Sequence, residues 1–215
     1  MTVIVDAQFI ASDGTNALSA SMTAGSALSS INGGFTIISN RARPNGTFAR
    51  FQTNDSIAQN ASTIAMDAYF ASALGSAPVI GVQHYNTGSG ASYSLEVGTG
   101  GGVLKRDTGS SETTVKTWSF SHPTALRYYL SSYGTGVFKI WREISGVISL
   151  VDTYTDASPL TTNCTTGYTN QDAGSYDTQG WQFDRFLVTD VEPVASGGSS
   201  IAAISSGYHL HGTAR

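Results

Sequence analysis

Paired carboxylates would be the clearest sign of chemistry in this 215-residue chain, because glycoside hydrolysis needs two of them facing each other across a substrate groove. The only four glutamates are far apart in the sequence: Glu96, Glu112, Glu143 and Glu192. No Glu-x-Asp-x-x-Glu motif occurs, and no expected strand carries a glutamate and a second acid two residues apart, the spacing that places both on one face. We therefore expect a protein that is not an enzyme.

Histidines and glycines offer no second route to catalysis. His84 and His122 lie in no recognisable nucleophile motif, and serine is so abundant that one near a histidine carries no information. The glycine-rich run at 98–102 precedes a strand pattern rather than a helix, so it predicts a hairpin turn and not a phosphate-binding loop.

Two groups of residues have the types that bind metal ions. Loop carboxylates can converge on Ca²⁺ at the rim of a sandwich, although aspartate in loops is also typical of turn capping. The candidates for such a calcium site are Asp152, Asp156, Asp172 and Asp177. His209 and His211 would lie on one side of an extended tail, where symmetry-related copies could share one metal. No other cofactor is expected.

Tyrosines and tryptophans outnumber what one core needs, at 10 and 3 of the 215 residues. Their rings can stack on sugars, as in a lectin, or pack between subunits, and they also fill large sandwich cores. The candidates for contact with a glycan or with another subunit are Trp118, Trp141, Tyr133 and Tyr176.

The charge and composition exclude several partners. A net charge of −4 and a sequence pI near 5.4 argue against nucleic acid, and Arg41, Arg43 and Arg50 are expected to form a solvated face. No run approaches the length of a membrane span, and Met1–Ile10 lacks a signal-peptide pattern, so we expect no membrane partner and synthesis in a cytoplasm. Cys164 is the single cysteine and is expected to be a small buried residue.

Short runs of β-branched and aromatic residues, separated by turn-forming residues, predict an all-β antiparallel sandwich with little helix and no repeat. The expected strands are Phe35–Arg43, Thr47–Thr53, Ser62–Ser72, Val79–Tyr85, Ser92–Gly98, Val103–Arg106, Thr113–Phe120, Thr124–Tyr133, Val137–Ile144, Val147–Thr155 and Gly180–Thr189. Apolar residues alternate from Ile64 to Phe70, so Asp67 should face away from the core. Gly134–Gly136 and Ser145–Gly146 predict two successive hairpins.

The composition changes after the last expected strand. We predict a sandwich domain over residues 1–191, a flexible Gly- and Ser-rich linker over 192–200, and a C-terminal tail over 201–215. The tail is too short for a core of its own but carries apolar residues, so we expect an assembly or anchoring arm held by a neighbouring subunit. Its candidate contact residues are Ile201, Ile204, Tyr208 and Leu210.

Three segments resemble the laminin G-like, concanavalin A-like jelly-roll domains that occur in phage virion proteins. Phe9–Ala42, with its "DGT" turn and terminal "SNRA", is similar to the family's opening; Leu126–Leu160 is similar to its central hairpins, and "GWQFDRFLVTD" at Gly180–Asp190 to its last strand. Leu28 departs from a frequent Trp and Arg185 from a frequent Asn. The resemblance implies a jelly-roll β-sandwich whose terminal strands pair.

The resemblance also implies a function. We expect a non-enzymatic phage structural protein exposed on the virion: a capsid decoration protein, a head fibre or a tail-associated adhesin. Its partners would be the major capsid protein or tail proteins and further copies of itself. The alternative is a carbohydrate-binding module or lectin that recognises a cell-surface or environmental glycan.

Overall fold

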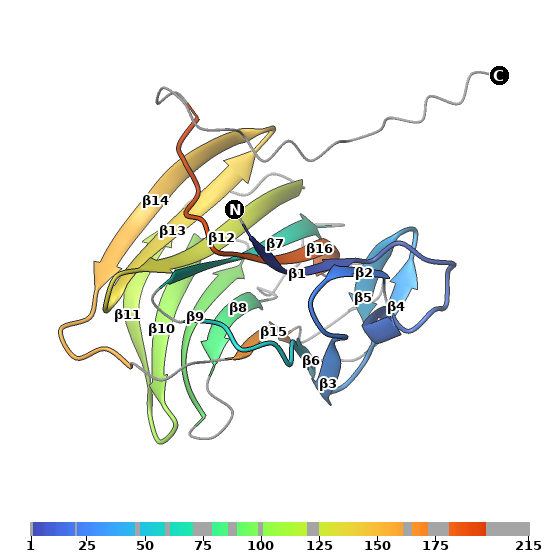
Figure 1. Ribbon diagram of the computed structural model, residues 1–215, viewed down its shortest axis with the longest axis horizontal. Coiled ribbons are helices and arrows are strands. Elements are labelled where there is room, and N and C mark those ends of the chain that lie inside the picture. The colour runs from blue at the N-terminus through green and yellow to red at the C-terminus, as the bar shows by residue number, and fades with distance from the viewer. Residues whose placement is uncertain are drawn as a thin grey trace.

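Alternating apolar residues build two antiparallel sheets that face each other across one core (Figure 1). The computed structural model describes residues 2–19, 21–45, 48–58, 61–70, 79–85, 90–98, 101–119, 125–160, 165–171 and 181–196. In this part of the chain the one helix is a short 3-10 turn, η1 (Ala17–Ser19), and no helix is long and apolar enough to cross a membrane.

Sheet A has nine strands, and its main path runs in the order β14-β13-β12-β7-β16-β1-β2, with β5 paired to β16 and β4 to β5. Its strands are β1 (Val3–Gln8), β2 (Ser21–Ala24), β4 (Phe35–Ile38), β5 (Arg41–Pro44), β7 (Ala61–Phe70), β12 (Ala125–Tyr133), β13 (Val137–Ile144), β14 (Val147–Thr155) and β16 (Trp181–Thr189).

Sheet B has seven strands in the order β11-β10-β9-β8-β15-β6-β3. Its strands are β3 (Ser29–Asn32), β6 (Phe48–Gln52), β8 (Val79–Tyr85), β9 (Ala91–Gly98), β10 (Gly101–Thr108), β11 (Glu112–Ser119) and β15 (Thr165–Gln171). Neighbouring strands in both sheets are often distant in sequence, which is the crossing pattern of a jelly roll.

Aromatic rings join the two sheets at the centre of the core. Phe51 of sheet B packs edge-on against Phe35 and Phe186 of sheet A, with ring centroids 5.4 and 5.3 Å apart. Phe9 and Phe183 extend the same cluster, and all five rings are buried. Rings of this size dominate the apolar area that a sandwich core removes from water.

The two terminal strands pair as expected. Val5 and Ala7 of β1 lie opposite Val188 and Phe186 of β16, and all four are fully buried. Beyond this pair, the Thr2 amide donates to Asp190 Oδ1 at 2.6 Å. The hairpins predicted at Gly134–Gly136 and Ser145–Gly146 are also confirmed, because β12, β13 and β14 follow one another in sheet A.

One predicted strand was wrong. Phe35–Arg43 is not a single strand but the hairpin β4–β5, and the chain reverses at Ser39 and Asn40, whose φ angles are 54° and 58°. A two-residue reversal of this kind needs positive φ at both positions, which asparagine tolerates. The Ser39 amide is held by Asp13 Oδ1 at 2.7 Å, which stabilises the turn.

Candidate functional site

A second apolar cluster lies on the face of sheet A that points away from the core, called here the outer face. On β7, Ile64 and Met66 point into the core, so Ala65 and Asp67 point outward. The cluster consists of Ala65, Tyr129, Trp141 and Leu187, with Val3 and Ile148 packed against it. It shares no residue with the main core.

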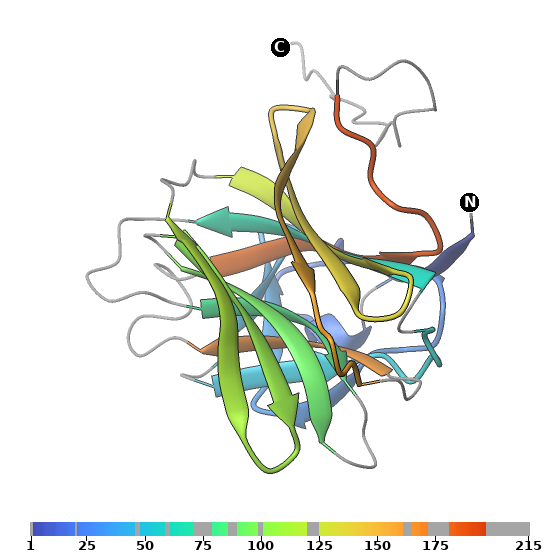
Figure 2. The same ribbon diagram turned by 90° about the vertical axis from the view of Figure 1, so that its left-hand side faces the viewer.

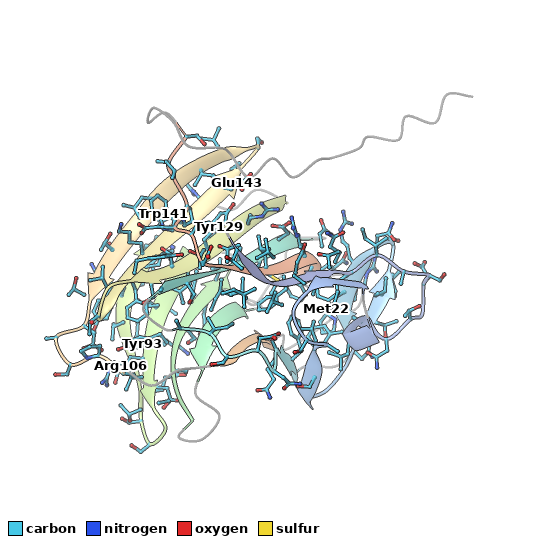
Figure 3. The ribbon with its side chains drawn as sticks, viewed as in Figure 1. Met22, Tyr93, Arg106, Tyr129, Trp141 and Glu143 are labelled. Carbon is cyan, nitrogen blue, oxygen red and sulfur yellow. The ribbon has the colours of Figure 1, made fainter. Side chains whose placement is uncertain are left out.

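Tyr129 and Trp141 form the centre of this cluster. They lie directly opposite each other on β12 and β13 and are 4% and 7% exposed. The Trp141 indole donates from Nε1 to Ser131 Oγ at 2.9 Å, and Lys139 Nζ lies 5.9 Å from the centroid of the Trp141 ring. The outer face therefore contains a nearly buried aromatic pair (Figure 3), and a cation lies beside the Trp141 ring.

A row of paired charges crosses the same face next to the aromatic pair. Arg127 of β12 binds Asp67 of β7, with Nη2 at 2.5 Å from Oδ2, and its Nη1 lies 3.5 Å from Glu143 of β13. The Tyr129 hydroxyl donates to Glu143 as well. Burial opposes the charge of the guanidinium, but its bonds to Asp67 outweigh this and raise the pKa of Arg127.

The charged row continues toward the N-terminal strand. Arg185 of β16 binds both carboxylate oxygens of Asp6 on β1, at 2.6 and 2.8 Å, and the Thr23 hydroxyl donates to the same carboxylate. Burial alone would raise the pKa of Asp6, but these bonds lower it below its ordinary value. Arg185 thus holds a buried acid.

The chain after β16 crosses the outer face as a strap, residues 190–196. The Thr63 hydroxyl donates to the Val191 carbonyl at 2.7 Å, and Glu192 pairs with Lys139 at 2.7 Å. At the far end, the Ser196 amide donates to the Ile148 carbonyl at 2.9 Å, and the Ile148 amide donates back to Ser196 Oγ at 2.9 Å. Figures 1 and 2 show this strap on the outer side of sheet A, beside the β13–β14 hairpin.

The aromatic residues predicted to contact a glycan or another subunit do not all lie on one surface. Trp141 and Tyr133 both lie on the outer face, where the Thr63 hydroxyl is 3.4 Å from the Tyr133 hydroxyl and burial raises the pKa of Tyr133 to about 12. Trp118 of β11 instead packs against the main core, with its ring so close over Gly102 that a Cβ there would lie 2.5 Å from it. Tyr176 lies outside the described residues.

Asp152 and Asp156, the two predicted calcium ligands among the described residues, are bound to other side chains of the protein. Asp156 accepts the Tyr93 hydroxyl at 2.5 Å, Arg106 Nε at 2.7 Å and the Ser158 amide at 2.8 Å, which ties the chain after β14 to sheet B. Asp152 lies 3.5 Å from Lys116 of β11, across the edge of the sandwich. Within the described ranges no three metal-binding side chains gather at one point.

Several candidates lie outside the described residues, so their roles stay predictions. They are the metal candidates Asp172, Asp177, His209 and His211 and the tail residues Ile201, Ile204, Tyr208 and Leu210. The predicted linker begins at Glu192, and its described part, 192–196, forms most of the strap.

Sequence reasoning missed the charged row and the strap. Arg127, Asp67 and Glu143 are separated by 60 and 16 residues in the chain and meet only because β7, β12 and β13 are neighbours. The sequence pattern did place one of them correctly, because the alternation from Ile64 to Phe70 predicted that Asp67 faces away from the core.

Comparison with solved structures identifies the fold. The chain is similar to the carbohydrate-binding module CBM66 from Bacillus subtilis (TM-score 0.57, 11% identity, 75% of this chain and 94% of that one). It is also similar to a Bacillus licheniformis β-glucanase (TM-score 0.59, 10% identity, 88% and 99%). A third similar structure is the CBM2 module of the evolved Dit protein of Lactobacillus casei BL23 phage J-1 (TM-score 0.54, 9% identity, 76% and 82%).

The protein is therefore an all-β sandwich of the concanavalin A-like class, as the sequence resemblance implied. No protein-family model and no curated protein matches the sequence. At 9–11% sequence identity, these similarities establish the fold and do not assign a function.

Proposed function

We propose that this chain is a non-enzymatic carbohydrate-binding domain that holds its ligand on the outer face of sheet A. The observation that carries the proposal is the Tyr129–Trp141 pair, which forms an aromatic cluster apart from the core and is surrounded by hydrogen-bonding groups. Sugar sites combine an aromatic surface for the apolar face of the ring with polar groups that fix its hydroxyls. The module named in the CBM66 structure supports the proposal, because it has the same fold.

The absence of catalysis is part of the proposal. Four acids of the outer face, Asp6, Asp67, Glu143 and Glu192, each contact a cation of the same protein. A glycosidase keeps one carboxylate available to attack or to activate water and a second to protonate the leaving group. Acids engaged in ion pairs and hydrogen bonds are instead suited to hold a surface in shape.

We further propose that the domain is displayed on a phage virion, attached to capsid or tail proteins and present in several copies. Its support is the opening and closing segments that resemble phage virion domains, together with the similar module in the Dit protein of phage J-1. The sequence alone favoured the structural role over glycan binding. The outer face and the similar modules favour glycan binding as the first role, and a virion component can have both.

A glycan array with matched tryptophan variants tests the binding proposal. Trp141→Ala is expected to lower binding of any recognised glycan at least about tenfold, because the stacking surface is lost. Trp118→Ala is the control, since that ring packs on the core at the other sheet. Thermal unfolding of both variants establishes that they are folded. The proposal fails if no glycan binds, or if Trp141→Ala binds as well as the unchanged protein.

The virion proposal has a separate test. Purified protein is mixed with capsids and with tails that lack it, and binding is followed by sedimentation and electron microscopy. Regular positions on either particle support display on the virion, whereas no binding to either removes that proposal and leaves the glycan proposal intact.

A further inference from the structure

We infer that the glycan recognised on the outer face carries a carboxylate, and that Glu192 of the strap occupies the position of this carboxylate in the free protein. The inference rests on the proposed carbohydrate-binding function and adds the chemical class of the ligand. Three observations lead to it: where the strap is anchored, which cation it neutralises, and how it is held.

The strap is anchored on both sides of Trp141. Along β13 the order is Lys139, Trp141 and Glu143; Glu192 binds Lys139, and Ser196 binds Ile148, which lies directly opposite Glu143. Residues 193–195 therefore join two anchor points, and along β13 Trp141 lies between the strand positions that hold them. A sugar that stacks on Trp141 would compete with this part of the chain for the same surface.

Lys139 differs from Arg127 and Arg185 in the acid that it binds. Arg127 and Arg185 are paired with Asp67 and Asp6, acids that belong to the sheet itself. The acid that binds Lys139 belongs to the strap, at 2.7 Å, and the Lys139 side chain is 34% exposed. When the strap leaves, the ammonium group stays 5.9 Å from the Trp141 ring centre and needs a new anion. A carboxylate on the stacked sugar meets that need.

The strap is held by contacts that a ligand can replace. Val191 is held by a part-buried bond from Thr63, but beyond it the bond at Ile148 is exposed to solvent and Val194, between the anchors, is 49% exposed. Exposed hydrogen bonds and ion pairs contribute little each, and segments held by them open at low free-energy cost. The Glu192–Lys139 pair thus resembles a bound ligand carboxylate in chemistry and is weak enough to be exchanged.

The test compares acidic sugars with neutral partners of the same skeleton. The probes are oligogalacturonate, hyaluronan oligosaccharide and sialyllactose, each with its methyl ester, measured by titration calorimetry on the full chain. At least one acidic member is expected to bind more tightly than its partner. Glu192→Gln should raise its affinity about two- to fivefold, the strength of an exposed ion pair.

Two further variants keep the inference falsifiable. Lys139→Gln should remove the difference between the acidic and neutral probes, while Glu112→Gln, which breaks an equivalent exposed pair with Lys105 on sheet B, should change nothing. The inference is overturned if no acidic probe binds Glu192→Gln better than its neutral partner, or if Lys139→Gln keeps the preference. A neutral glycan that still depends on Trp141 would leave the proposed function standing, and the absence of any bound glycan would remove both.

Discussion

Arg127 is the residue whose loss should damage the outer face most. Its side chain is 8% exposed, and it neutralises Asp67 and Glu143, which are 15% and 21% exposed. Arg127→Leu would leave two largely buried carboxylates without their cation. Breaking a buried pair in this way costs about 3–5 kcal/mol, and part of this is the penalty of the charges left behind. The loss is a large share of the total stability of about 5–15 kcal/mol that a domain of this kind has.

Urea unfolding at neutral pH, followed by tryptophan fluorescence, measures this cost. The double variant Asp67→Leu with Arg127→Leu should recover a substantial part of the stability, because one stranded charge is removed with its partner. Recovery should be incomplete, since Glu143 still lacks the guanidinium and keeps only the Tyr129 hydroxyl. Lys116→Leu is the control, because its pair with Asp152 is 3.5 Å long and exposed, and should cost less than about 1 kcal/mol. A cost below about 1 kcal/mol for Arg127→Leu, or a double variant less stable than the single one, would refute this account.

Three further predictions concern the core and its edges. Gly102→Ala should destabilise the protein by about 1–3 kcal/mol in urea unfolding, because the new methyl group meets the Trp118 ring; an unchanged midpoint would contradict that packing. Tyr93→Phe should cost about 1–3 kcal/mol, since Asp156 loses a buried donor, and a neutral result would mean that the hydroxyl bond adds nothing. Asp6 has a folded-state pKa below its ordinary 3.8, so its contribution to the free energy of unfolding is present above pH 3.8 and is lost as the pH falls through the folded-state pKa. Asp6→Asn should therefore flatten the acid side of a plot of stability against pH. An unaltered slope would contradict this sign.

Most of the longer strands were predictable from the sequence, and several short strands were not. The three strands β12, β13 and β14 and both hairpins between them follow from their side-chain pattern and their glycines. The strands β2, β3 and β15 have the sequences SMTA, SSIN and TTGYTNQ, which contain few large apolar residues and no clear apolar alternation. They become strands because a neighbouring strand offers backbone hydrogen bonds, which is information that a local pattern does not contain.

The sequence predicted tryptophans as candidate contact residues, but not which of them lies on the outer face. Trp118 and Trp141 both lie in strands rich in β-branched or charged residues, and nothing in their neighbourhoods separates them. Their roles are decided by the pairing partner: Trp118 lies opposite Gly102, which leaves room for its ring on the core side, and Trp141 lies opposite Tyr129 on the outer face. The choice of face depends on register, which is set by the whole sheet.

The aromatic cluster and the ion pairs of the outer face are more than folding alone requires. The main core already joins both sheets through its aromatic centre, and it contains neither Tyr129 nor Trp141. Closing the sandwich does not require a second aromatic cluster, nor a buried Arg127 pair, which hydrophobic residues would replace at little or no cost in stability. Paired charges hold a surface in a fixed shape, and the proposed exchange of the strap for a ligand needs a surface that keeps its shape when the strap leaves. The proposed ligand-binding role accounts for both features together.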